Sequence, residues 1–115
     1  MESSGSTVTE GIGIGRITAN FKKARLDGAI QGTDAEAINM AHYLLRNEGL
    51  FVGPSTGLNC VGAVKMARKM GPGSTIVTIL CDSGERYQTK VFNTAFLEQH
   101  GLALSLDGQS LNFVS

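Results

Sequence analysis

The sequence predicts an α/β fold built on part of a doubly wound sheet. The 115 residues leave room for a single domain. Apolar runs of strand length alternate with segments of helical periodicity, which is the order of a parallel sheet with helices between its strands. Fifteen glycines beside only five phenylalanines and two tyrosines indicate tight backbone turns around a modest aliphatic core.

Charge and cysteine content restrict the classes of partner. Ten basic residues balance ten acidic ones, which favours neither nucleic acid nor a membrane surface as a partner. No apolar run reaches the length of a transmembrane helix, and no signal segment opens the chain. We therefore expect a cytoplasmic protein, with a mitochondrial location also open, and reduced, buried thiols at Cys60 and Cys81.

The ends of the chain are predicted to lie outside the folded unit. Residues 1–9 are rich in Ser, Thr, Glu and Gly and predict a flexible lead-in. Residues 10–102 form the expected partial α/β domain, which opens on a glycine-rich loop at Gly11–Gly15. Residues 103–115 form a tail, whose weak alternation around Asp107-Gly108 indicates a frayed hairpin.

The first strand and helix follow this loop. Residues 29–31 are a short strand candidate, and Thr33 with Glu36 forms a capping box that starts a helix. Gly49 is placed to end that helix in a left-handed conformation. One face is apolar at helical spacing and is made of Ala37, Met40, Ala41, Leu44 and Leu45.

Two further strands and two helices complete the order. Leu50–Val52 reads as a buried strand, followed by a turn at 53–57 and a helix from Thr56 to Met70. Residues 75–81 are apolar without alternation, the pattern of a parallel strand covered on both faces, and a last helix spans Asn93 to His100. Three strands supply few neighbours for a parallel sheet, so we expect further chain to complete it.

The two glycine-rich turns form the candidate site, because ligands of open α/β sheets bind where strands end. Ser55 and Thr56 lie at a predicted helix N-terminus, where they either meet a ligand or serve as an N-cap. The pattern Gly53-x-Ser55-x-Gly57, followed by Asp82 and His100, also fits the order of a serine hydrolase. Too few residues precede Ser55 to hold the strands and oxyanion loop of that fold.

The remaining polar residues predict no catalytic group and no metal site. We expect His42 to be a solvated surface residue on the polar side of its helix. A reactive lysine needs a desolvated pocket, and the five lysines stand in polar or helical contexts. They are Lys22, Lys23, Lys65, Lys69 and Lys90.

Three segments in register resemble the C-terminal half of cysteine synthases, over about Val8 to Leu102. They are Glu10-Gly11-Ile12-Gly13, Gly53-Pro54-Ser55-Thr56-Gly57, and the run Ile79 to Tyr87 with the letters ILCDSGERY. In that family they correspond to the E-G-I-G, G-x-S-[SA]-G and L-P-D-S-G-E-R-Y segments. Two departures are Cys81, where the family usually has proline, and Thr56, where it commonly has serine or alanine.

The resemblance implies the C-terminal part of a type II pyridoxal-phosphate enzyme fold. It implies that Ser55 donates its hydroxyl to the pyridine nitrogen, that Gly11, Ile12 and Gly13 bring backbone near the cofactor, and that Asp82 and Ser83 lie behind the ring. Arg86 and Tyr87 are expected to brace that loop. The family's Schiff-base lysine and phosphate-binding loop belong to the preceding half, which nothing in this chain matches.

The expected function is therefore that of a fragment or truncated form of a cysteine synthase-like enzyme. The parent would replace the β-substituent of O-acetylserine, or a similar small amino-acid substrate, with sulfide in cysteine biosynthesis. This chain alone is expected to be inactive and to bind pyridoxal phosphate weakly or not at all. Its expected partner is the missing N-terminal half or a second copy in a homo-oligomer. The alternative function is a non-catalytic module that docks on a partner.

Overall fold

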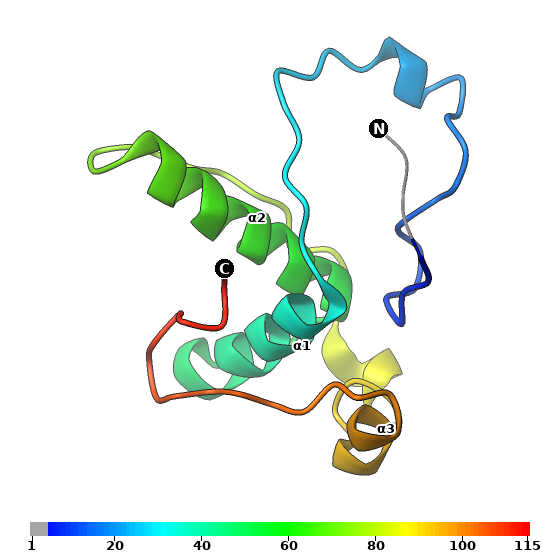
Figure 1. Ribbon diagram of the computed structural model, residues 1–115, viewed down its shortest axis with the longest axis vertical. Coiled ribbons are helices and arrows are strands. Elements are labelled where there is room, and N and C mark those ends of the chain that lie inside the picture. Colours follow the sequence, from blue (N-terminus) through cyan, green and yellow to red (C-terminus); the bar gives the residue numbers. More distant parts are fainter. Residues whose placement is uncertain (1–4) are drawn as a thin grey trace.

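The computed structural model describes residues 5–115, so the first four residues of the predicted lead-in lie outside the described part of the chain. Two crossing helices form its centre, α1 at Asp34–Tyr43 and α2 at Pro54–Met70 (Figure 1). The other helical elements are short: η1 at Phe21–Lys23, η2 at Leu44–Glu48, η3 at Gly84–Tyr87 and α3 at Thr94–Gln99.

The predicted capping box at the start of α1 is confirmed. The Glu36 backbone N–H donates to Thr33 Oγ1 over 3.2 Å, and the Thr33 backbone N–H donates to Glu36 Oε2 over 2.8 Å. A single π-helical turn, η2, extends α1 until Gly49 ends it at φ 68°. This turn leaves Leu45 37% exposed, so Leu45 does not belong to the buried apolar face.

The second predicted helix is also confirmed and begins two residues earlier than expected. Gly53 is the N-cap and Pro54 the first helical residue, a position that suits proline because its φ is already helical and its missing N–H is not needed. Gly71 ends the helix at φ 85°.

α1 and α2 pack closely because Gly57 has no side chain. A Cβ at position 57 would lie 2.2 Å from the backbone oxygen of Ala37, a distance that no real carbon can adopt. The larger buried core lies beside this crossing and consists of Met40, Leu44, Val52, Val61 and Val114. A second core joins α1 to η3 and α3 and consists of Ile38, Tyr87, Val91 and Leu97.

The segments predicted as strands form no sheet in residues 5–115. Their one ladder contact is an antiparallel bridge between Val52 and Ser83. Residues 75–80 have no strand partner there, and Val77 is 86% exposed. A strand requires a neighbour that accepts and donates its backbone hydrogen bonds. The partial doubly wound sheet is therefore not confirmed.

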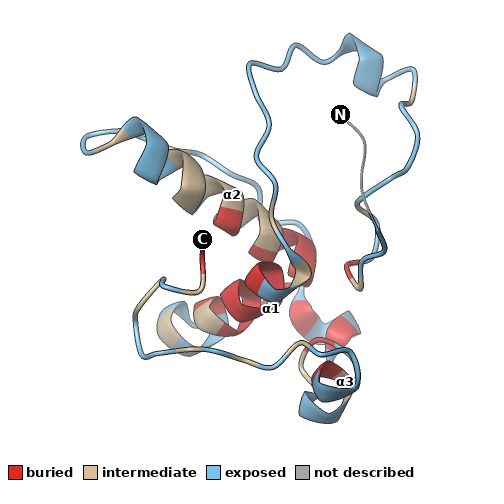
Figure 2. Ribbon diagram, in the orientation of Figure 1, coloured by how far each residue is buried: buried red, intermediate tan, exposed pale blue. Residues whose placement is uncertain are grey.

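The molecule exposes more surface than a compact protein of its mass. Its accessible surface is 7779 Å², whereas a 12.1 kDa folded monomer is expected to expose roughly 6,000 Å². Figure 2 shows the reason, since buried residues gather on α1, on the first turns of α2 and on η3, while the long arm before α1 is exposed almost throughout. Part of the apolar surface thus lacks cover within this chain.

Two predictions about single side chains are wrong. His42 is buried, with Nε2 2.8 Å from the Val91 backbone oxygen and its ring 4.8 Å from that of Phe92. The periodicity of α1 could not reveal that residues 91–92 cover its polar side. Cys81 is exposed because its expected strand neighbours are missing, whereas Cys60 is half-buried; both are free thiols.

The last helix is confirmed, but the C-terminal hairpin prediction is wrong. Asn93 caps α3 through its side-chain oxygen, which accepts from the backbone N–H of Ala95 over 3.0 Å. Residues 103–115 form no strand and instead return across α1 and α2, where Val114 is buried.

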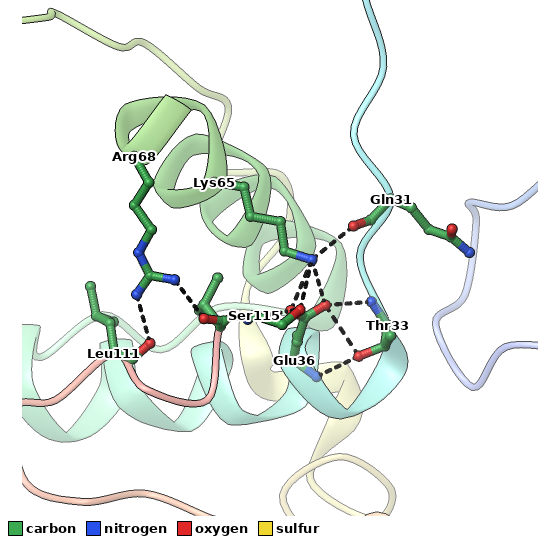
Figure 3. A network of polar contacts seen from close by, with 8 residues as sticks. Gln31, Thr33, Glu36, Lys65, Arg68, Leu111 and Ser115 are labelled. Atoms are coloured by element: carbon green, nitrogen blue, oxygen red, sulfur yellow. Dashed lines mark hydrogen bonds and ion pairs between the residues drawn. The ribbon is translucent and has the colours of Figure 1, made fainter. Parts of the chain in front are cut away.

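Polar contacts hold the end of this returning segment (Figure 3). Glu36 accepts from the Ser115 backbone N–H over 2.9 Å and from Lys65 Nζ over 2.9 Å. Arg68 donates to the backbone oxygens of Val114 and Leu111, over 2.5 Å and 3.0 Å. The division at residue 102 remains a prediction, although these contacts join the tail to both central helices.

Candidate ligand site

A hollow of about 430 Å³ lies where three segments distant in the sequence meet. The segments are the glycine-rich loop near residue 11, the first turn of α2, and the run from Cys81 to Tyr87. The hollow brings together four residues that the sequence analysis selected. Its lining consists of Glu10, Gly11, Ile12, Ser55, Cys81, Asp82, Arg86 and Tyr87.

Ser55 is the second residue of α2, directly after Pro54. It is only 9% exposed, and no atom of residues 5–115 forms a hydrogen bond with its hydroxyl. The N-cap is Gly53, so the alternative in which Ser55 or Thr56 caps the helix is wrong. The hydroxyl of this largely buried residue is thus free to bind a ligand in the hollow, and the unpaired N–H groups of the first turn favour an acceptor nearby.

Hydrogen bonds fix the run after residue 80 against the start of α2. Thr56 is fully buried, and its Oγ1 accepts from the Cys81 backbone N–H over 2.8 Å. The Gly53 backbone N–H donates to the backbone oxygen of Asp82 over 3.0 Å. The Thr56 hydroxyl therefore stabilises the fold, whereas the hydroxyl of its neighbour Ser55 remains available to a ligand in the hollow.

Asp82 and Tyr87 form a hydrogen-bonded pair at one side of the hollow. The Tyr87 hydroxyl donates to Asp82 Oδ2 over 2.7 Å, and this bond to a carboxylate raises the pKa of Tyr87 above its usual range. Asp82 Oδ1 is buried and has no partner in residues 5–115. The pair packs on Gly53, where a Cβ would lie 2.5 Å from Oδ1, so the glycine is required by this close approach.

Two of the selected residues do not line the hollow. Gly13 has φ 70°, and a Cβ there would lie 3.4 Å from the Thr7 side chain. Ser83 pairs with Val52 and caps η3, its Oγ accepting from the Glu85 backbone N–H over 3.4 Å. Glu10, Cys81, Arg86 and Tyr87 also line the hollow; they were not predicted as binding residues, although all four lie within the segments that carry the resemblance.

No lysine lines the hollow among the residues that the structure describes. Lys65 pairs with Glu36, away from the site. Lys90 donates to Glu10 Oε1 over 2.5 Å, and this contact lowers the pKa of Glu10. Residues 5–115 also contain no cluster of three His, Cys, Asp or Glu side chains placed to hold a metal ion.

The geometry does not support the hydrolase pattern. His100 follows α3, its Nδ1 is 2.8 Å from the Phe96 backbone oxygen, and its ring stacks on that of Phe96. It is absent from the lining of the hollow, and no hydrogen bond in residues 5–115 joins it to Ser55. Ser55 thus lacks the base that a nucleophilic serine needs.

A small-molecule site at a helix N-terminus, closed by a glycine-rich loop and holding a free hydroxyl, is the kind that cofactor-dependent α/β enzymes use. Residues 1–82 match the family "Pyridoxal-phosphate dependent enzyme". The chain belongs to this family, and the type II fold follows at the level of the family.

The predicted similarity to cysteine synthases is confirmed. The chain is 55% identical to "Cysteine synthase" of Dictyostelium discoideum over 91% of its own length. It is 46% identical to "Cysteine synthase 2" of Schizosaccharomyces pombe over 94%, and 45% identical to "Putative mitochondrial cysteine synthase" of Saccharomyces cerevisiae over 85%. The matches cover 28%, 28% and 25% of these relatives, so the chain spans little more than a quarter of their length.

The hollow fits the ring-nitrogen end of pyridoxal phosphate. The Ser55 hydroxyl, which has no partner in residues 5–115, is of the chemical type that can donate to a pyridine nitrogen, and Gly11 and Ile12 line the same hollow. The residues that line the hollow include no lysine for the aldehyde and no phosphate-binding loop.

Within residues 5–115 no helix is long and apolar enough to cross a membrane.

Proposed function

We propose that this chain supplies the ring-nitrogen side of the cofactor site in a cysteine synthase-like enzyme. The enzyme would exchange the β-substituent of O-acetylserine, or a similar activated serine, for sulfide. The observation that carries the proposal is Ser55, a residue only 9% exposed, whose hydroxyl is unpaired within residues 5–115 and which lines a hollow together with Gly11 and Ile12.

An alcohol at this position favours β-replacement. Pyridoxal phosphate, when bound, supplies an electron-withdrawing ring. The Ser55 hydroxyl is too weak an acid to protonate a pyridine nitrogen, so it can hold the ring in place while the ring remains a mild electron acceptor. Mild withdrawal suits loss and replacement of a β-substituent. Thr56 holds the Cys81 backbone and Asp82 packs on Gly53, so these residues keep Ser55 and the neighbouring loop in register.

The same proposal explains the apolar surface that the chain leaves uncovered. Residues 50–52 and 75–81 would become strands of a partial doubly wound sheet when paired with further chain, either an N-terminal half or a second copy. Val77, Ile79 and Leu80 are 86%, 66% and 51% exposed, an extent that favours such cover. The lysine and phosphate contacts would come from the N-terminal half, since a second copy of this chain does not carry them.

The proposed compartment is the cytoplasm or the mitochondrion. Free thiols at Cys60 and Cys81 are typical of a reducing compartment, and the Saccharomyces cerevisiae relative is named as mitochondrial.

A complementation experiment tests the proposal. The chain is produced together with a second polypeptide, the part of the Dictyostelium discoideum cysteine synthase that it does not match. We expect cysteine formation from O-acetylserine and sulfide by the pair and by neither part alone, with a loss of about tenfold for Ser55→Ala, as expected when a hydrogen bond worth about 1.4 kcal/mol is removed. Cysteine formation by the chain alone, or full activity of the Ser55→Ala pair, contradicts the proposal.

Cofactor binding by the chain alone should be very weak. Ser55 offers one hydrogen bond worth about 0.5–1.5 kcal/mol, and the loop adds some packing. A few kcal/mol correspond to millimolar affinity at best. We therefore expect the chain to stay colourless after mixing with stoichiometric pyridoxal phosphate and dialysis. A visible absorption band that survives dialysis and disappears when one lysine is replaced overturns this view.

The docking-module alternative rests on the exposed apolar residues near 77. Light scattering after size exclusion tests this alternative, because a module of this kind should associate at micromolar concentration. A monomer that unfolds cooperatively would leave the docking alternative without support.

A further inference from the structure

Cys81 lies at the same hollow as Ser55. It is one of the residues that line the hollow, and it is exposed to solvent. The other thiol, Cys60, lies half-buried on α2 beside the larger core and is not part of the lining.

Contacts with one face of α2 hold Cys81 in place. Its backbone N–H donates to Thr56 Oγ1 over 2.8 Å, and its Sγ accepts from the Asn59 side-chain amide over 3.5 Å. The same amide donates to the Ile79 backbone oxygen over 2.9 Å. Ser55 and Asn59 are four residues apart and therefore share one face of the helix. The thiol thus lies against the helix face that presents Ser55.

Ser55 provides independent evidence that a ligand belongs in this hollow. The residue is only 9% exposed and lines the hollow, and its hydroxyl has no hydrogen-bond partner in residues 5–115. A hydroxyl in this position takes its hydrogen bond from a molecule that enters the hollow, either water or a ligand. A group attached to Cys81 would compete for that space.

We propose that Cys81 is a thiol-modification site through which a small disulfide blocks the ligand hollow. The Cys81 sulfur attacks one sulfur of the disulfide, a new S–S bond forms to Cys81, and the old S–S bond breaks. The departing thiolate takes up the proton that Cys81 gives up, and a thiol reductant reverses the exchange. The site and its chemistry follow from the hollow alone; only the identity of the excluded ligand rests on the proposed function.

Burial makes Cys60 the natural internal control. Desolvation raises the pKa of the Cys60 thiol, which reduces the reactive thiolate and limits access of a reagent. The same chain therefore carries one thiol at the hollow and one packed beside the core.

Labelling with cystamine measures the difference between the two thiols. Peptide mass spectrometry after timed exposure should find Cys81 modified at least about tenfold faster than Cys60, with equal rates in the urea-unfolded chain. Equal rates in the folded chain overturn the proposal, and so does faster reaction of Cys60.

Nuclear magnetic resonance of the Cys60→Ser variant locates the attached group. The cysteamine adduct on Cys81 should shift the amide signals of Gly11, Ile12, Ser55 and Tyr87, and the reductant should restore them; the doubly substituted Cys60→Ser, Cys81→Ser chain should show no change. Shifts confined to residues 79–83 mean that the group points away from the hollow, which overturns the proposal.

A ligand arm separates this inference from the proposed function. Pyridoxine phosphate, which lacks the aldehyde and cannot react with lysines, should slow labelling of Cys81 at millimolar concentration without affecting Cys60. Absence of protection together with adduct shifts in the hollow would count against the cofactor contact while supporting the modification site. Protection of Cys81 without adduct shifts in the hollow would support the cofactor contact and count against the modification site.

Discussion

Glu36 and Lys65 join α1 to α2 through an ion pair of 2.9 Å, with only 6% and 16% of their side chains exposed. Glu36 also closes the capping box of α1 and binds Ser115, so one carboxylate serves two helices and the returning C-terminal segment (Figure 3). Removing this charge should therefore loosen three elements together.

The variant Glu36→Gln tests this role. Loss of one partner leaves the Lys65 charge largely buried and unpaired, which should lower the free energy of unfolding by about 2–4 kcal/mol. Urea unfolding followed by circular dichroism measures the change. The exposed Glu48→Gln is the control and should stay within about 0.5 kcal/mol of the unsubstituted chain. Equal effects of the two variants would show that the buried pair contributes no net stability.

Acid should remove the same contribution. Burial alone would raise the pKa of Glu36, but hydrogen bonds from Lys65, Ser115 and Thr33 outweigh it and lower the pKa from 4.5 to about 2. The unfolded chain therefore takes up this proton first as the pH falls, so the stabilisation is complete above pH 4.5 and is lost toward pH 2. Across this range the free energy of unfolding should decrease less with falling pH for Glu36→Gln than for the unsubstituted chain. The same pH dependence in both chains contradicts the assignment.

His42 predicts a separate dependence at higher pH. Burial is the main cause that lowers the pKa of His42, and the bond to the Val91 backbone oxygen only partly opposes it. Because the unfolded chain protonates near pH 6.5 while the folded chain does not, stability should fall as the pH drops below about 6.5. Midpoints of urea unfolding at pH 8 and pH 5.5 measure this. The difference should shrink in His42→Gln and persist in the exposed His100→Gln.

Gly57 should tolerate no side chain, whereas another glycine of the same helix should. Gly57→Ala would force a Cβ to within 2.2 Å of the Ala37 backbone oxygen, so the helices must separate. We expect a loss of about 2–4 kcal/mol. Gly62→Ala meets nothing within 4 Å and should add about 0.5–1 kcal/mol through helix propensity. Thermal unfolding of both variants measures these changes. A shift of the melting temperature in the same direction for both would refute the close crossing of α1 and α2.

Ser55 and Thr56 should differ sharply although they are neighbours. Thr56→Ala leaves the Cys81 backbone N–H without its buried acceptor and should cost about 1–3 kcal/mol. Ser55→Ala removes no hydrogen bond within residues 5–115 and should change stability by less than about 0.5 kcal/mol. Denaturant unfolding compares them. A stability loss at Ser55 as large as that at Thr56 would mean that Ser55 acts in the fold and is not reserved for a ligand.

Local signals in the sequence determined the helices and most of the site. The Thr33 and Glu36 capping box and the left-handed Gly49 are properties of neighbouring residues, so they could be predicted without knowledge of the fold. The resemblance of the three segments to cysteine synthases likewise implied that Gly11, Ile12, Ser55 and Asp82 lie around one site, and all four line the same hollow. Their role in cofactor binding remains a prediction.

Tertiary structure alone decided the features that depend on partners distant in the sequence. The helical pattern left His42 on a polar face, but residues 91–92 fold onto that face and bury it. Residues 75–81 have the composition of a covered strand, yet Val77 and Cys81 are exposed because strand pairing requires backbone partners that residues 5–115 do not supply. Helix formation needs only the hydrogen bonds within one segment, whereas a sheet and a buried side chain need the rest of the fold.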